Sequence, residues 1–148
     1  MVDEKPRILV VDDDASIRRV LKAILEEKGY VVDTASNGKE AVKKCKNRFY
    51  NLALVDIRLP DIEGTKLLDK LAVNVPKMRK VIITGYPSLQ NAVEAVNKGA
   101  DAYIIKPLNM DKTLATIEEQ LKKQREEEKM TEEKLVEFIE TRIKKLEA

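Results

Sequence analysis

The sequence has no histidine and no tryptophan, a single cysteine, and no long hydrophobic run. Without histidine, the chain cannot supply an imidazole base, a histidine-ligated zinc ion or a phosphohistidine of its own. The single cysteine, Cys45, excludes an internal disulfide and suits a reducing compartment, and we expect it to pack among apolar neighbours. The longest apolar runs, such as 8–11 and 52–55, fall far short of the ~20 residues that cross a bilayer. These absences predict a cytoplasmic protein without membrane contact.

Neither sign of charge dominates the sequence. It has 28 Lys and Arg residues against 26 Asp and Glu residues, a net charge of +2. The segment up to Pro107 has 19 basic and 15 acidic residues, and the remainder has 9 and 11, so neither part has the basic excess of a nucleic-acid-binding surface. We therefore expect no direct contact with nucleic acid. The 148 residues, 43% of them hydrophobic, suffice for one domain with a full core and an additional helix.

Short apolar runs rich in branched residues alternate with longer segments of helical periodicity, which is the pattern of a βα repeat. Because the runs are apolar throughout, the strands should be covered on both faces, and short connections favour right-handed crossovers. The sequence predicts an α/β fold, a doubly wound five-stranded parallel sheet in the order 2-1-3-4-5 with five helices. The expected strands are 8–11, 31–35, 52–55, 81–83 and 102–105, and the expected helices are about 15–28, 39–45, 65–71, one between Pro87 and Gly99, and one from about Asp111.

Glycine and proline mark several of these boundaries. Gly29 and Gly99 should end the helices that precede them, because glycine readily adopts the left-handed conformation that closes a helix. Pro87 favours the start of a helix, and Pro76 indicates a loop before the fourth strand. In the helix between Pro87 and Gly99, the residues expected to face inward are Ala92, Val93 and Val96.

The composition changes near the end of the last helix. Residues 122–134 are almost wholly charged, and an amphipathic segment follows them. We divide the chain into a domain at 1–124 and a charged helical extension at 125–148. If the helix ran unbroken from Asp111 to Leu146, it would be about 54 Å long and would have to project or fold back. The extension is either a solvated helix or an element that docks on a partner or a second copy through Leu135, Phe138, Ile139, Ile143 and Leu146.

Polar side chains follow four of the five predicted strands. In a doubly wound sheet, ligand sites form beyond the carboxyl ends of the strands at the point where strand order reverses. Each of these residues has an ordinary explanation when taken alone, as a turn, a cap or solvated surface. Four strand ends that supply complementary groups make a stronger case for a site. The residues are Asp12, Asp13 and Asp14 after the first strand, Asp56 after the third, Thr84 after the fourth and Lys106 after the fifth.

The types of group at these strand ends predict phosphoryl chemistry. Clustered carboxylates repel one another unless a cation lies between them, and Mg²⁺ suits carboxylate, carbonyl and water oxygens that also meet a phosphate. With the metal on one side of Asp56 and Lys106 on the other, charge on a transferring phosphoryl group would be stabilised while the carboxylate acts as nucleophile. The Thr84 hydroxyl could then donate a hydrogen bond to the phosphate.

The segments that carry these residues resemble the receiver domain of two-component response regulators. The resemblance covers residues from about Arg7 to Leu121 and rests on "ILVVDDDASIRRVL", "LALVDIRLPDIEG", "VIITGY" and "DAYIIKP". It implies that Asp56 is the phosphoacceptor. It also implies a Mg²⁺ site made of Asp13, Asp56 and the backbone carbonyl of Arg58, with Asp12 contributing through water.

The same resemblance implies a conformational switch. Thr84 matches the switch hydroxyl, Tyr103 the aromatic residue that changes rotamer on activation, and Lys106 the site lysine before a cis peptide bond to Pro107. Arg58 and Tyr86 occupy the positions that adjust phosphate hydrolysis in the family, although ordinary exposed loop residues would explain them equally well. The chain would not be an enzyme in the usual sense, since it would catalyse only its own phosphorylation and dephosphorylation.

The resemblance also implies partners. The phosphoryl donor would be a phosphohistidine on a sensor kinase, which agrees with the absence of histidine here. Activation would alter the face made by the helix between Pro87 and Gly99, the strand at 102–105 and the helix from Asp111. A downstream effector or a second copy would bind at this face or at the C-terminal helix.

The main alternative is a Mg²⁺-dependent phosphatase of the haloacid dehalogenase type. Asp12, Asp14 and Ser16 mimic the opening motif of that class. The interpretation gives Asp56 no role, however, and it requires a later acidic pair that does not follow Lys106. A further alternative is an inert receiver that serves as a scaffold for the helical extension, against which the intact acidic set argues.

Overall fold

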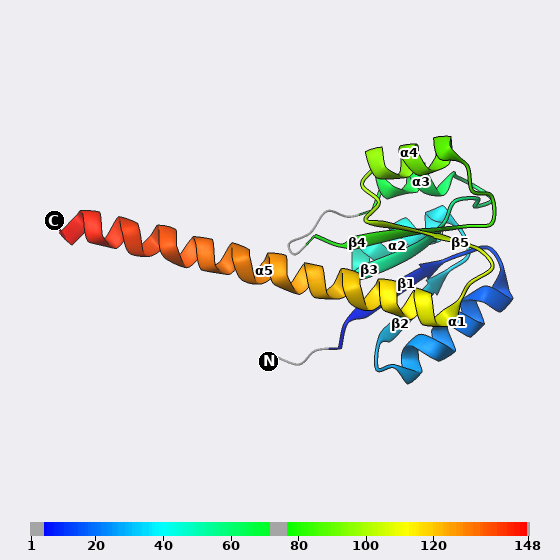
Figure 1. The fold of residues 1–148 in the computed structure, drawn as a ribbon, viewed down its shortest axis with the longest axis horizontal. Helices are drawn as coiled ribbons and strands as arrows, with labels where there is room; N and C mark the ends of the chain where they lie inside the picture. Colours follow the sequence, from blue (N-terminus) through cyan, green and yellow to red (C-terminus); the bar gives the residue numbers. More distant parts are fainter. Residues whose placement is uncertain (1–4, 72–76, 148) are drawn as a thin grey trace.

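The computed structural model describes residues 5–71 and 77–147. Its centre is a parallel five-stranded sheet in the order β2-β1-β3-β4-β5 (Figure 1). The order reverses between β1 and β3, as the sequence predicts, and the doubly wound fold is confirmed. Pro76 lies outside the described residues. The strands are β1 (Arg7–Val11), β2 (Val31–Ala35), β3 (Leu52–Asp56), β4 (Arg79–Thr84) and β5 (Ala102–Ile105).

Helices cover both faces of the sheet. Successive strand residues point to opposite sides, so strands that are apolar throughout present an apolar surface on each face. In β1, Ile8 and Val10 pack with α1 and α5, whereas Leu9 and Val11 pack with α2, α3 and α4. The fully buried strands therefore belong to two cores, one for each helical layer. The helices are α1 (Ala15–Glu27), α2 (Gly38–Asn47), α3 (Gly64–Leu68), α4 (Leu89–Asn97) and α5 (Met110–Glu147).

Local capping fixes the helix boundaries. Asn37 caps α2 by accepting a hydrogen bond from the Glu40 amide, and Ser88 does the same for α4. Gly29 and Gly99 have φ angles of +97° and +93°, so both adopt the left-handed conformation expected after a helix. Cys45 is buried, as expected. Capping and glycine chemistry thus locate the strand–helix connections in which the polar residues lie.

The orientation predicted for α4 is wrong. Val93 and Val96 do not face inward: they are 50% and 68% exposed, and Leu89, on the same helical face, is 82% exposed. The helix packs on the sheet through the small side chain of Ala95, while Ala92 is only partly buried. Helical periodicity revealed an apolar stripe, but α4 approaches the sheet through its alanine side and leaves the larger residues in solvent.

Helix α5 projects rather than folding back (Figure 1). Its 38 residues correspond to a length of about 57 Å, and its apolar stripe of Leu114, Ile117 and Leu121 packs on the sheet. The division expected at residue 124 lies inside this continuous helix and stays a prediction. Within the described ranges, no helix is both long and apolar enough to span a membrane.

A group of polar contacts holds α5 where it leaves the sheet. Gln124, 2% exposed, donates hydrogen bonds to the carbonyls of Asn51 and Lys77 at 2.8 and 2.9 Å and accepts one from the Asn51 side chain at 3.2 Å. Arg79, at the start of β4, forms ion pairs with Asp101 and with Glu127 of α5. The helix is therefore fixed up to about Glu127.

Candidate functional site

The carboxyl ends of four strands bring the expected polar residues together. Asp12 and Asp56 are 1% and 5% exposed, and Thr84 is fully buried. The Lys106 ammonium lies between the two carboxylates, with Nζ 3.0 Å from Asp12 Oδ2 and 3.3 Å from Asp56 Oδ2. A single cation thus bridges two buried anions at the edge where the strand order reverses.

Asp13 completes a cluster that could hold a metal ion. One carboxylate oxygen from each of Asp12, Asp13 and Asp56 lies within 4.8 Å of the others, and Asp13 is exposed at the entrance. Lys106 supplies one positive charge against three carboxylates, so the cluster has an excess of negative charge. An all-oxygen set with one solvent-facing member fits a hard divalent cation such as Mg²⁺, which retains some of its water.

Asp56 is held at the end of β3 by its own backbone surroundings. The amide of Arg58 donates to Asp56 Oδ1 at 3.2 Å. A Cβ atom on Gly64 would lie only 2.2 Å from the Asp56 carbonyl oxygen, so only glycine permits the chain to pass this close. Burial, together with the charge of Asp12, raises the pKa of Asp56 above its ordinary value, although the Arg58 amide and Lys106 oppose that shift.

Lys106 responds to the same group of charges. Burial disfavours its ammonium, but the hydrogen bonds and charges of Asp12 and Asp56 outweigh this effect and raise its pKa. The backbone fixes its position, since the Lys106 amide donates to the Thr84 carbonyl at 2.7 Å. The peptide bond to Pro107 is cis, as expected. The lysine therefore remains charged where the two carboxylates need a counterion.

Asp14 has a different role from its acidic neighbours. Its carboxylate caps α1 by accepting hydrogen bonds from the Ser16 amide and hydroxyl, at 2.9 and 2.6 Å, and from the Ile17 amide. The Ser16 hydroxyl and amide lower the pKa of this carboxyl. The Asp14 carboxylate is thus engaged in capping α1 and is not part of the cluster formed by Asp12, Asp13 and Asp56.

Thr84 and Tyr103 lie on adjacent strands. The Thr84 hydroxyl accepts a hydrogen bond from the Tyr86 amide at 2.9 Å, which leaves its own proton available to donate. Tyr103 packs against the core on the side of α4, and its buried hydroxyl has no hydrogen-bond partner among the described residues. This conformation of Tyr103 therefore leaves a buried hydroxyl without a hydrogen bond, which costs free energy.

Two residues at the rim of the site stack on each other. The Arg58 guanidinium lies 3.7 Å from the centre of the Tyr86 ring, a cation–π contact that joins the loops after β3 and β4. The sequence placed both residues near the site but gave no signal of their contact. It also gave no indication of the role of Gly64, although this glycine lies within a quoted motif.

Comparison with known proteins identifies the family to which this fold and this cluster of carboxylates belong. The model of the response regulator receiver domain family matches residues 8–118. The chain belongs to this family. It is therefore a signalling domain of the two-component systems, with the fold and the strand-end acidic residues typical of receivers.

Named relatives extend the comparison. The transcriptional regulatory protein ZraR of Klebsiella oxytoca is 40% identical over 121 residues, which cover 82% of this chain but 27% of ZraR. The chain thus spans about a quarter of this relative. Because ZraR is a transcriptional regulator, the comparison does not support the expectation that nucleic acid plays no part.

Solved structures agree on the fold. A CheY-like receiver domain protein from Methanospirillum hungatei has a TM-score of 0.80 and 49% identity, covering 84% of this chain and 99% of that one. A response regulator from Burkholderia pseudomallei, solved with a phosphorylated aspartic acid, a calcium ion and citrate, has a TM-score of 0.70 and 31% identity. It covers 86% of this chain and 75% of the other.

Proposed function

We propose that Asp56 accepts a phosphoryl group from a phosphohistidine on a sensor kinase, in a reaction that depends on Mg²⁺. The observation that carries the proposal is the Lys106 ammonium between Asp12 and Asp56, 3.0 and 3.3 Å from their oxygens. A buried carboxylate beside a fixed cation is arranged to develop and hold negative charge. The phosphorylated aspartic acid of the Burkholderia pseudomallei relative is consistent with this role.

The chemistry of transfer follows from the groups present. One carboxylate oxygen of Asp56 forms a bond to phosphorus while the bond from phosphorus to the imidazole nitrogen of the donor breaks, and the imidazole keeps the electron pair. Lys106 neutralises charge on the phosphoryl oxygens, and the Thr84 hydroxyl donates to one of them. Asp12, Asp13, Asp56 and the Arg58 carbonyl would hold Mg²⁺, which would supply a second positive charge to the transferring phosphoryl group.

An apolar groove beside Lys106 is the surface we assign to the donor. It lies between α1 and the segment after β5, encloses about 300 Å³, and includes Ile17, Val20 and Met110. Val20 is 48% exposed, so its apolar side chain is accessible to a partner at this groove. A helix that carries the phosphohistidine could pack here and bring its imidazole to Asp56.

The output surface is proposed on the face formed by α4, β5 and α5. Leu89, Val93 and Val96 form one exposed face of α4, and Ile105 of β5 is 53% exposed. When phosphate draws the Thr84 hydroxyl towards it, Tyr103 can move into the space beside Thr84 and relieve its unpaired hydroxyl. The face formed by α4, β5 and α5 would then bind an effector or a second copy.

The phosphatase alternative is weakened by Asp14. That interpretation pairs Asp12 with Asp14, yet the Asp14 carboxylate is engaged by the first turn of α1. The chain would instead catalyse only its own phosphorylation and the later hydrolysis of the acyl phosphate.

The proposal is tested by incubating the full chain with acetyl phosphate and following its intact mass. We expect one phosphoryl group per chain with Mg²⁺ and none with a chelator, because the carboxylate cluster then lacks its second cation. Asp56→Asn should abolish labelling, while Asp69→Asn, an exposed aspartate on the surface, serves as the matched control. Labelling that persists with the chelator would contradict the metal dependence.

A further inference from the structure

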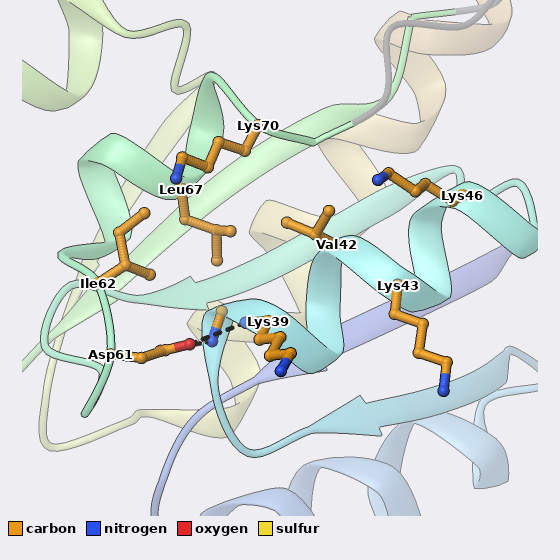
Figure 2. Close-up of a pocket in the computed structure, with 9 residues that line it drawn as sticks. Lys39, Val42, Lys43, Lys46, Asp61, Ile62, Leu67 and Lys70 are labelled. Carbon is orange, nitrogen blue, oxygen red and sulfur yellow. Dashed lines mark hydrogen bonds between the residues drawn. The ribbon is translucent and has the colours of Figure 1, made fainter.

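Away from the strand ends, a groove of about 520 Å³ lies between α2 and α3. Figure 2 shows its apolar residues, Val42, Ile62 and Leu67, lying between the two helices. The groove depends on a close approach, because a Cβ atom on Gly38 would lie 2.3 Å from the Ile62 side chain. Among the described residues that line it, Asp61 is the only acidic one, and it accepts hydrogen bonds from the Gly38 and Lys39 amides.

Four lysines surround this apolar floor. Lys39, Lys43 and Lys46 extend from α2, and Lys70 lies at the α3 side (Figure 2). None of the four forms an ion pair with the residues that the structure describes, although lysines elsewhere in the molecule do. Like charges around one groove repel one another, so an acidic occupant with apolar side chains would suit both its floor and its walls.

The projecting part of α5 has this composition. Residues 126–140 have seven glutamates against two lysines. Leu135, Phe138 and Ile139 are 57%, 59% and 48% exposed, and they belong to neither hydrophobic core of the residues that the structure describes. Glu132 precedes Leu135 by three residues, so on a helix it borders the apolar stripe. Glu140 borders Ile143 in the same way. The segment thus combines apolar anchors with flanking acids.

The same chain cannot bring this segment into its own groove. Helix α5 packs with α1 on one face of the sheet, whereas α2 and α3 lie on the other face. The contacts of Gln124 and Glu127 direct the helix away from the body, and the rest of α5 continues without a break (Figure 1).

We propose that the acidic amphipathic segment of α5, residues 126–140, docks in the lysine-lined α2–α3 groove of a second copy of this chain. Phe138 and its apolar neighbours cover the partly exposed Val42 and Ile62, and Glu132 and Glu140 approach the lysines. A reciprocal exchange, with each helix in the partner's groove, gives a closed two-fold dimer and leaves no unsatisfied surface for further growth. The interaction is independent of Asp56 and therefore of the proposed phosphorylation.

Charge reversal on the two surfaces tests the proposal in the full chain. Lys43→Glu with Lys70→Glu alters one residue on each side of the groove, and Glu132→Lys with Glu140→Lys alters the helix. By sedimentation equilibrium we expect a wild-type dimer, a dimer dissociation constant raised about tenfold or more by either pair, and recovery when both pairs are combined. The matched control is Lys112→Glu with Lys122→Glu, exposed positions on α5 outside the groove, which should leave the constant unchanged.

A second measurement identifies the contact itself. Mixed light and heavy-isotope chains, treated with a carbodiimide that joins carboxylates to amines, should give crosslinks between 126–140 and the groove lysines that contain one chain of each kind. Normal circular dichroism and Mg²⁺-dependent phosphorylation would show that the variants fold. A chain that stays monomeric, a dimer indifferent to the groove pair, a dimer equally weakened by the control pair, or failure of the combined variant to recover would overturn the proposal.

Discussion

At the scale of single residues, the site is a problem of charge balance. Asp12 and Asp56 are both buried, and the ammonium of Lys106 lies within 3.3 Å of each. The rule that polar groups collect beyond strand ends was sufficient to bring these three residues together with Asp13 and Thr84. It could not separate Asp14 from its neighbours, because capping depends on backbone geometry that three consecutive aspartates do not reveal.

Replacing Asp56 with asparagine tests whether the buried charge of Asp56 lowers the free energy of unfolding. Because the pKa of Asp56 is raised, the folded protein binds the proton more tightly than the unfolded chain, and stability is lost as pH rises through the folded pKa. Asp56→Asn removes this pH-dependent loss of stability, because an asparagine side chain does not ionise. In the absence of divalent ions, the variant should be more stable than wild type near neutral pH.

This advantage should shrink as pH falls towards 3.8, the ordinary aspartate pKa, because wild-type Asp56 then becomes protonated as well. Urea unfolding of both proteins at a series of pH values measures the difference. A variant less stable than wild type at neutral pH, or a difference independent of pH, would show that Asp56 is not held at an electrostatic cost.

At the scale of helices and strands, hydrophobic patterning predicted the architecture well. Each expected strand coincides with an observed one to within two residues, because fully buried parallel strands are continuous apolar runs that turn residues interrupt. The face of α4 was predicted wrongly for a related reason. Val93 and Val96 have the spacing of a buried stripe, but a helix that packs through Ala95 can expose that stripe to a partner.

The start of α1 offers a test of the local role assigned to Asp14. Asp14→Ala removes the acceptor for the Ser16 and Ile17 amides, so we expect a melting temperature lower by a few degrees. Phosphorylation by acetyl phosphate should continue. Asp14→Asn is the matched control, because its side-chain oxygen can still cap the helix. Loss of phosphorylation in both variants would instead favour a catalytic Asp14.

At the scale of the whole molecule, the first part of α5 packs on the sheet of the receiver and the rest of the helix projects into solvent. The length for an unbroken helix follows from the sequence, but how the helix is held does not, because Gln124 contacts residues 73 and 47 positions away in the chain. Contacts of that range leave no local periodic signal. The helix direction is therefore a property of the folded molecule that only the structure reveals.

Removing this attachment should loosen the helix from the sheet. Gln124→Met keeps a similar volume but removes all three side-chain hydrogen bonds of Gln124, including the one from its amide to the Lys77 carbonyl, so we expect a loss of about 1–3 kcal/mol in unfolding free energy. Hydrogen exchange should rise in α5 and at the starts of β3 and β4. Glu126→Ala, an exposed neighbour, should change neither quantity.

The central claim, that Asp56 accepts the phosphoryl group, is tested most directly by locating that group. After incubation with acetyl phosphate and Mg²⁺, the acyl phosphate can be trapped by reduction with borohydride and its position read by peptide mass spectrometry. We predict modification at Asp56 alone. Modification at Asp12, together with undiminished labelling of Asp56→Asn, would contradict the account and favour the phosphatase alternative.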